Sequence, residues 1–394
     1  MTRLAQAVQA IPPSGIRKYF DLAAQMEGVI SLGVGEPDFI TPWHVREAAI
    51  SALEDGYTSY TPNSGLPALC REISRYLSKR FAVVTDPEEE ILVTVGASEG
   101  IDLAIRAITD PGDEILLVEP CYVSYEPIIR LAGGVPVKIA TTQATNFKLT
   151  PQHIREKVTA KTKAIIFSYP NNPTGAIMTR KELLEIAKVV QQLDLLVISD
   201  EIYAELTYTG HPVSFASLPG MKDRTVLLSG FSKAFAMTGW RIGYAAGPRD
   251  IVQAMTKIHQ YTMLCAPINA QMAALEALQH GFSDMRRMVD SYAQRRNYVT
   301  HALREIGLDS FEPEGAFYAF PDISATGLSS DQFAERLILE EKVAVVPGHV
   351  FGSSGEGHVR CSYATSIEKL REAMARMERF VARYAKQHSR THLG

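Results

Sequence analysis

Cysteine and long apolar runs are scarce in this sequence of 394 residues. Its four cysteines lie far apart, so they predict neither a disulfide framework nor a CxxC metal site, and we expect no metal. No apolar stretch approaches the roughly 18 residues that a membrane span needs. The N-terminus also lacks the apolar core and the cleavage site of a signal peptide. We therefore expect a soluble, cytoplasmic protein.

An excess of either charge is also absent. The 40 basic and 44 acidic residues give a formal net charge of -4, without a block of Lys or Arg. This balance argues against nucleic acid or a membrane surface as the main partner. Hydrophobic residues make up 46% of the chain and Gly and Pro are ordinary in number, which excludes disordered and collagen-like proteins. The length allows two or three domains with a large core.

Short β-rich runs alternate with helical segments from about residue 90. Strands are expected at 91–95, 114–118, 135–139, 163–168, 195–199, 225–229 and 242–246. This alternation predicts a three-layer α/β domain around a mostly parallel sheet. After residue 250 helical periodicity dominates, and a smaller α+β segment follows with a last helix at 366–385. We expect a large domain over 45–280 and a small domain formed by 1–44 and 281–394, which includes an N-terminal arm.

Two ionisable residues follow buried strands, where sheets of this kind bind ligands. Asp200 comes directly after the strand at 195–199, and a buried acid is costly unless a cation meets it. It could instead cap a helix. Lys233 follows the strand at 225–229 among small and apolar residues, where a desolvated amine has a lowered pKa and forms Schiff bases. The alternative is an ordinary solvated loop lysine.

Two turns after strands could also serve a ligand. Pro170 and Pro173 stiffen the turn that presents Asn172, although such a turn could simply redirect the chain. The Gly96-Ala97-Ser98 turn joins a strand to a helix, and its small residues allow backbone N–H groups to close on an anion.

The same turn matches G-x-S-x-G, the nucleophile elbow of serine hydrolases, with Ser98 as the nucleophile. That alternative needs an acid and a histidine later in the chain. An oxyanion loop of the HGGG type does not precede Ser98, and the ten histidines occupy no distinctive turn, so the match has little support.

Five segments, in this order, resemble fold-type I pyridoxal-phosphate aminotransferases of class I/II. They are Gly33–Phe39, Asn172-Pro173-x-Gly175, Asp200-x-x-Tyr203, Ser232-Lys233-x-x-x-Met237-Thr238-Gly239-Trp240-Arg241-x-Gly243 and Arg360–Ala364. The resemblance covers nearly the whole chain. It implies pyridoxal 5'-phosphate as cofactor, amino acids and 2-oxo acids as substrates, and a homodimer with shared active sites.

The resemblance implies a role for each residue near the cofactor ring. Lys233 would hold the cofactor through a Schiff base and then carry the proton that moves during the reaction. Asp200 would pair with the pyridine nitrogen, and Tyr203 and Asn172 would donate hydrogen bonds to the 3' oxygen. Tyr122 would stack on the ring; it could otherwise be an ordinary core aromatic.

The phosphate would lie at the Gly96-Ala97-Ser98 turn with Arg241 as its fixed cation. Many relatives carry a serine three residues before the lysine as a phosphate ligand, but this position is Gly230 here. Ser232 or backbone N–H groups would compensate. Tyr60 would reach the phosphate of the neighbouring subunit.

The resemblance also implies how the substrate is held. Arg360 would clamp its α-carboxylate, because a planar guanidinium fork suits that group. Asn172 and Gly35 would lie beside the substrate, and the segment around Ser14 and Ile16 would close over it.

The predicted reaction is a ping-pong transamination with 2-oxoglutarate as the shared 2-oxo acid. Some aspartate enzymes hold the side-chain carboxylate of the substrate with a lysine, but this position is Ser98 here, which argues against a strict aspartate preference. An apolar pocket could be lined by Ile16, Phe20, Tyr60 and Tyr122. The pattern is similar to bacterial aromatic, N-acetyl-diaminopimelate and aspartate aminotransferases, and we expect an aromatic or broad preference. The alternatives are a pyridoxal-phosphate-dependent β- or γ-lyase and the serine hydrolase that uses Ser98.

Overall fold

The computed structural model describes residues 3–13 and 15–391. Its centre is a seven-stranded sheet in the order β2-β8-β7-β6-β5-β3-β4. All neighbouring pairs are parallel except the two that involve β8. The strands are β2 (Ile91–Thr94), β3 (Glu114–Glu119), β4 (Val135–Ala140), β5 (Thr162–Ser168), β6 (Leu196–Asp200), β7 (Thr225–Gly230) and β8 (Gly243–Ala246). The mostly parallel α/β sheet expected from the sequence is confirmed.

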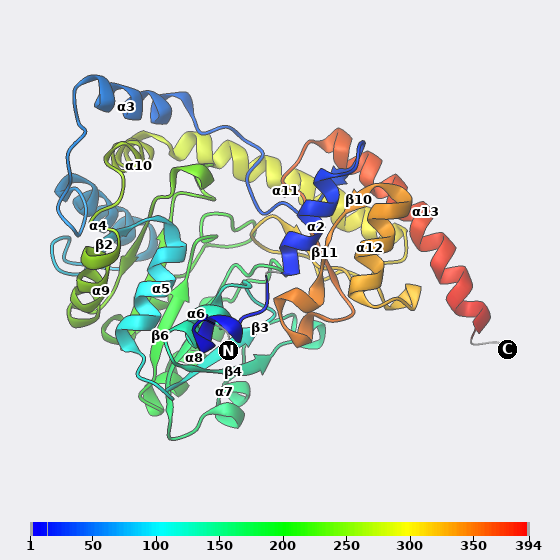
Figure 1. Ribbon diagram of the computed structural model, residues 1–394, viewed down its shortest axis with the longest axis horizontal. Helices are drawn as coiled ribbons and strands as arrows, with labels where there is room; N and C mark the ends of the chain where they lie inside the picture. The colour runs from blue at the N-terminus through cyan, green and yellow to red at the C-terminus, as the bar shows by residue number, and fades with distance from the viewer. Residues whose placement is uncertain (1–2, 14, 392–394) are drawn as a thin grey trace.

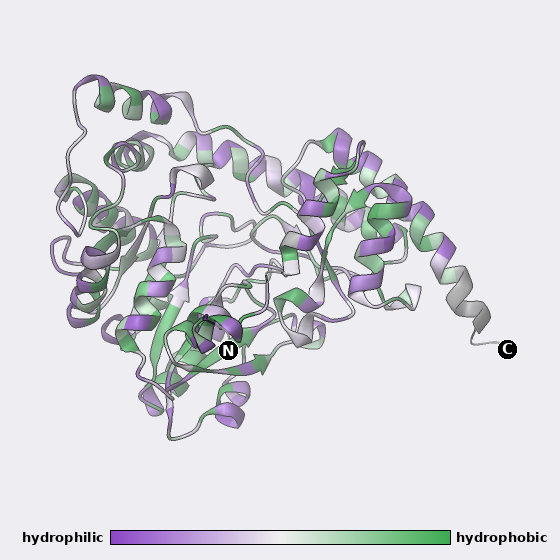
Figure 2. Cartoon of the chain, viewed as in Figure 1, coloured by the Kyte–Doolittle hydropathy of each residue, from purple (hydrophilic) through white to green (hydrophobic). Residues whose placement is uncertain are grey.

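Alternate residues of the strands enter two different cores, because side chains in a strand point to opposite faces. In β3, Ile115 and Leu117 pack with α5, α6 and α9, whereas Leu116 and Val118 pack with α7 and α8 on the other face. This gives the three layers, and the strands are accordingly apolar along their length (Figure 2). The helices of this part are α3 (Trp43–Glu54), α4 (Pro67–Phe81), α5 (Gly96–Ile108), α6 (Tyr125–Leu131), α7 (Pro151–Lys157), α8 (Arg180–Gln192), α9 (Arg249–Thr262) and α10 (Ile268–His280).

A smaller α+β part lies beside the large sheet, and the long helix α11 runs from one to the other (Figure 1). Its short strands form a parallel pair, β1 with β10, and an antiparallel sheet in the order β11-β12-β9. The bounds are β1 (Ile30–Ser31), β9 (Tyr318–Ala319), β10 (Val343–Ala344), β11 (Val346–Pro347), β12 (Val359–Ser362), α11 (Phe282–Glu305), α12 (Ser330–Glu341) and α13 (Ile367–Thr391). The helix α13 therefore extends beyond the expected end at residue 385. The domain boundaries near 45 and 280 stay a prediction.

The N-terminal segment connects the two parts. Its helix α1 (Gln6–Gln9) packs near α6, and α2 (Gly15–Ala24) packs near α12 and β11. Short 3-10 helices complete the chain: η1 (Gln143–Thr145), η2 (Phe215–Ser217), η3 (Lys222–Arg224), η4 (Thr238–Trp240), η5 (Ser324–Thr326), η6 (Gly348–Phe351) and η7 (Ser353–Gly355). Within the described residues, no helix is both long enough and apolar enough to cross a membrane.

An ion pair between a partly exposed arginine and a buried carboxylate fixes α4 to the loop after β6. Glu205 is buried, and Arg80 donates to both of its carboxylate oxygens from Nε and Nη2, at 2.8 to 3.1 Å. The hydroxyl of Tyr76 donates to the same carboxylate at 2.8 Å. The pair therefore ties the C-terminal half of α4 to the loop that follows β6.

Replacing Arg80 should destabilise the protein, because among the described residues the buried carboxylate of Glu205 would keep only the hydroxyl of Tyr76 as a donor. We expect Arg80→Ala to lower the free energy of unfolding by about 2 kcal/mol. Urea titration followed by circular dichroism measures this. Arg75→Ala, on the same helix, is the matched control, since its pair with Glu72 is more exposed and should contribute at most about 0.5 kcal/mol. Equal losses in the two variants would contradict the prediction.

Candidate active site

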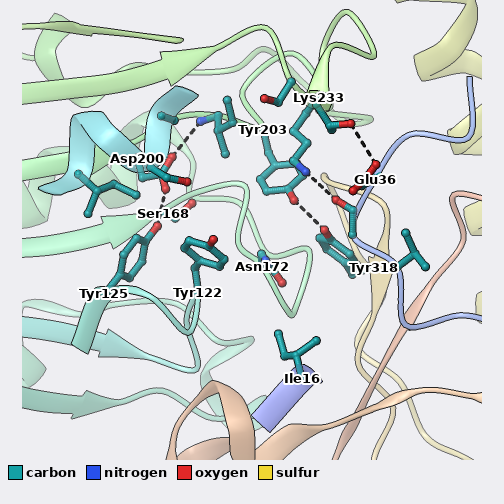
Figure 3. Close-up of a pocket in the computed structure, with 18 of the residues that line it drawn as sticks. Ile16, Glu36, Tyr122, Tyr125, Ser168, Asn172, Asp200, Tyr203, Lys233 and Tyr318 are labelled. Carbon is teal, nitrogen blue, oxygen red and sulfur yellow. Dashed lines mark hydrogen bonds between the residues drawn. The ribbon is translucent and has the colours of Figure 1, made fainter. Parts of the chain in front are cut away.

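The carboxyl ends of the strands surround a cavity of about 350 Å³. All the site residues predicted from the sequence line it except Gly96 and Tyr60. Those that line it are Ile16, Gly35, Ala97, Ser98, Tyr122, Asn172, Asp200, Tyr203, Ser232, Lys233, Arg241 and Arg360. Figure 3 shows that Asp200, Tyr203 and Lys233 point into the same space, opposite Tyr318 and Ile16. Residues far apart in the sequence are thus brought together because parallel strands end at one edge of the sheet.

Lys233 reaches this space from the loop after β7. Its ammonium group donates to the backbone carbonyl of Gly35 at 2.6 Å. Burial disfavours the charged amine and lowers the pKa of Lys233 to about 8, while the nearby carboxylate of Glu36 acts in the opposite direction. Near neutral pH, the neutral amine is therefore far more available than in an exposed lysine.

Asp200, the last residue of β6, is a buried carboxylate with no ion pair among the described residues. Tyr125 donates its hydroxyl proton to Oδ2 at 2.5 Å, and the backbone N–H of Ile202 donates to Oδ1 at 3.2 Å. Burial raises the pKa of Asp200, whereas these two hydrogen bonds and the charge of Lys233 oppose the rise. The carboxylate is therefore held in place but lacks a cationic partner.

Arg360, on β12, approaches from the smaller part of the protein and is 3% exposed. Nη1 donates to Oδ1 of Asn172 at 2.9 Å and Nη2 donates to the carbonyl of Gly33 at 2.7 Å, while Nε has no partner. The guanidinium lies 4.4 Å from the ring centroid of Tyr318. It forms no ion pair with a described residue, so a buried fork is left ready for an anion.

The Gly96 turn lies against the guanidinium of Arg241, an arrangement that suits an anion. Gly96 begins α5 with a φ of +76°, and a Cβ there would lie 2.5 Å from Nη2 of Arg241. A side chain at Gly96 would therefore displace the guanidinium. The backbone N–H groups at the start of this 13-residue helix and the arginine thus share one space.

The turn that carries Asn172 is rigid for reasons visible in its neighbours. Oδ1 of Asn171 accepts hydrogen bonds from the backbone N–H and the hydroxyl of Thr174, at 3.2 and 2.9 Å. The side-chain amide of Asn171 donates to the carbonyl of Pro120 at 3.2 Å. The turn therefore holds Asn172 against Arg360, in agreement with the expectation that it presents an amide to the site.

The cavity also contains residues for which the sequence analysis gave no role, among them Tyr125, Tyr318 and Glu36. The hydroxyl of Tyr125 donates to Asp200. The hydroxyls of Tyr318 and Tyr203 form a hydrogen bond of 2.7 Å with each other. Glu36 accepts a hydrogen bond from the hydroxyl of Thr238 at 3.0 Å. Tyr125 could have been found, since it lies three residues after Tyr122 in the same strand-to-helix connection. Tyr318 lies on a two-residue strand, which leaves no periodic signal.

Four further positions named in the sequence analysis lie outside the cavity or outside the described residues. Tyr60 lies outside the cavity and is 83% exposed on this single chain. Gly230 pairs with Gly243 across β7 and β8, and a Cβ on it would lie 2.9 Å from the Cα of Gly243. A serine here would press on β8, which explains the glycine. Ser14 and the side chain of Phe20 lie outside the described residues.

The structure gives no support to Ser98 as a hydrolase nucleophile. Ser98 lies in the cavity, yet none of the described residues that line it is a histidine. A serine nucleophile needs a base within hydrogen-bond reach. Ser98 instead occupies the first turn of α5, beside the anion position.

Comparisons with known proteins find relatives over nearly the whole chain. The family described as aminotransferase class I and II matches residues 27–377. YugH of Bacillus subtilis strain 168, named as an aminotransferase, is 59% identical over 96% of this chain and 98% of its own. The solved aromatic aminotransferase of Pyrococcus horikoshii OT3 has a TM-score of 0.89 and 44% identity, covering 93% of this chain and 99% of its own. The solved aspartate aminotransferase of Thermus thermophilus with maleate has a TM-score of 0.92 and 39% identity, covering 96% of this chain and 100% of its own.

The amine of Lys233 should react at a lower pH than exposed lysines. Because only the neutral amine is nucleophilic, labelling of the cofactor-free protein by acetic anhydride should be half-maximal near pH 8. Mass spectrometry of the labelled peptides measures this, with the exposed lysines of the same digest as reference. Glu36→Gln should shift the midpoint further down, since it removes a charge that favours the ammonium form. A midpoint that coincides with the exposed lysines would refute the assignment.

Proposed function

The chain belongs to the class I and II aminotransferases, which depend on pyridoxal phosphate, and we propose that it moves an amino group between an L-amino acid and a 2-oxo acid, with 2-oxoglutarate as the shared 2-oxo acid. One observation carries the proposal: a single cavity holds Asp200 and Arg360, each without an ionic partner among the described residues, beside the desolvated amine of Lys233. Buried charges of this kind are costly unless a ligand meets them.

The residues of the cavity fit pyridoxal phosphate. The start of α5 and the guanidinium of Arg241 suit a phosphate group, with Ser232 beside them. Asp200 suits a protonated pyridine nitrogen, which would offset the cost of burying the carboxylate. The ring of Tyr122 would lie on the cofactor ring, and Tyr203 and Asn172 would bind its 3' oxygen.

When bound, pyridoxal phosphate supplies a ring that accepts the electrons left behind as the substrate loses its α-proton. Arg360 would bind the substrate α-carboxylate through its fork, beside Asn172 and the backbone of Gly35. This contact would orient the α-carbon towards Lys233. The neutral Nζ of Lys233 would then take the α-proton of the donor amino acid, and in the second half of the reaction Nζ would donate a proton to the α-carbon of the incoming 2-oxo acid. The same residues would serve the incoming 2-oxo acid, so the two substrates would react in turn at one site.

The walls of the cavity favour an aromatic or broad substrate preference over a strict aspartate preference. In the described part of the chain, Lys233, Arg241 and Arg360 are the cationic side chains that line it, and each already has a role above. A second carboxylate on the substrate would therefore lack a cation from these residues. Ile16 and Val34 contribute apolar surface instead. Relatives carry both names, with an aromatic enzyme of Thermococcus litoralis at 45% identity and an aspartate enzyme of Pyrococcus abyssi at 46%.

We propose that two copies of the chain form a homodimer and that Tyr60 completes the phosphate site of the other copy. Tyr60 is exposed on one chain, and other large apolar side chains near it in the sequence are exposed as well: Ile40, Trp43 and Tyr57. We infer that these side chains contribute to the contact between the two copies. A cytoplasmic location stays a prediction from the sequence.

A two-substrate assay tests the proposed reaction. The enzyme loaded with pyridoxal phosphate should convert L-phenylalanine and 2-oxoglutarate into phenylpyruvate and glutamate in equal amounts, with kcat/KM at least about tenfold above that for aspartate. Lys233→Ala should lower the rate by more than about 10³-fold, because the proton carrier is lost. Lys188→Ala, which changes an exposed lysine, is the control.

The same assay distinguishes the alternative functions. Ammonia release without consumption of 2-oxoglutarate would indicate a lyase. Ester cleavage that needs Ser98 but no cofactor would indicate a hydrolase.

Mixed dimers test the shared site. Tyr60→Ala and Lys233→Ala should each have little activity as pure proteins, since each removes a part of every site. Unfolding and refolding the two variants together should restore activity, because one site of a hybrid dimer receives an intact tyrosine and an intact lysine. Activity is measured with the same two substrates, and each variant refolded alone is the control. A mixture no more active than its components would contradict the proposed sharing.

A further inference from the structure

Tyr125 occupies a special position between two residues of the site. It begins α6, only three residues after Tyr122, and is 1% exposed. Its hydroxyl donates to Oδ2 of Asp200 at 2.5 Å (Figure 3). Its ring meets the ring of Tyr122 edge-on, with centroids 5.7 Å apart. One side chain thus contacts both the carboxylate at the end of β6 and the aromatic ring after β3.

Tyr125 is also the side chain that fixes the carboxylate plane of Asp200. Among the described residues, the two donors to this carboxylate are Tyr125 on Oδ2 and the backbone N–H of Ile202 on Oδ1. One donor on each oxygen prevents rotation of the group. A carboxylate has about four acceptor positions, so these contacts leave acceptor capacity for a ligand in the cavity.

We infer that Tyr125 is a positioning residue, whose hydroxyl keeps Asp200 ionised and aimed at the position of the pyridine nitrogen. The inference rests on the proposed function and adds to it a residue for which the sequence analysis gave no role.

The chemistry of the phenol suits this task better than that of a cation would. Burial raises the pKa of Tyr125 well above its ordinary value, so the hydroxyl keeps its proton and remains a donor. A lysine or arginine at this position would neutralise Asp200 and compete with a protonated ring nitrogen. A neutral donor stabilises the anion and leaves its charge available. Without the hydroxyl, one of the hydrogen bonds that oppose the effect of burial would be lost, and the pKa of Asp200 would rise further.

Cofactor affinity tests the inference without relying on turnover. The dissociation constant of pyridoxal phosphate from the cofactor-free protein is measured by equilibrium dialysis. Tyr125→Phe keeps the ring against Tyr122 and removes only the hydroxyl, and we expect binding about tenfold weaker. Tyr76→Phe is the matched control, because it removes a tyrosine-to-carboxylate hydrogen bond of 2.8 Å, to Glu205, outside the cavity. The control should bind the cofactor as the unmodified protein does.

A double-mutant cycle separates positioning through Asp200 from general loss of structure. Asp200→Asn removes the anion that the hydroxyl serves, so adding Tyr125→Phe to it should weaken binding by less than about twofold. Affinity of Tyr125→Phe within about twofold of the unmodified protein, or a full tenfold loss that persists in the Asp200→Asn background, would overturn the inference. If the unmodified protein failed to bind pyridoxal phosphate, the proposed function itself would fall, and this inference with it.

Discussion

The structure depends on holding opposite charges in one cavity without letting them pair. Asp200 and Arg360 are both almost fully buried, and each is bound by neutral groups: a phenol and a backbone N–H for the acid, an amide and a carbonyl for the arginine, whose Nε has no partner among the described residues. Direct pairing would use up both charges and leave neither for a ligand. Tyr203 and Tyr318, which form a hydrogen bond with each other, line the same cavity.

This separation requires both parts of the fold. The large sheet supplies the acid and the lysine from the ends of β6 and β7, where short loops allow little freedom. The smaller part supplies Arg360 from β12, whose neighbour β9 carries Tyr318. Arg360 then joins the parts through Asn172 and through Gly33 of the N-terminal third. A ligand carboxylate at this guanidinium would therefore contact a residue that is itself tied to both parts.

The fold could be predicted largely from the sequence because the inner strands of the large sheet are buried on both faces and form nearly continuous apolar runs in the sequence. The strand preceding Asp200 and the strand preceding Lys233 were placed within one residue of their observed bounds. Short elements were harder: β9 has two residues, and its Tyr318 gave no periodic signal. The helix α13 was expected to end at 385, but its periodicity does not mark the end that the structure shows at Thr391.

Local periodicity was enough to show which chemical groups follow which strands, since it places Asp200, Lys233 and the Gly96 turn at strand ends regardless of how the strands are ordered. Which side chains touch one another within the site could be seen only in the folded chain. Strand order brings Tyr125 to Asp200 across 75 residues of sequence, and the packing of the two parts brings Arg360 to Asn172 across 188. Such contacts depend on which sheet faces and edges adjoin, and local sequence patterns carry no information about that adjacency.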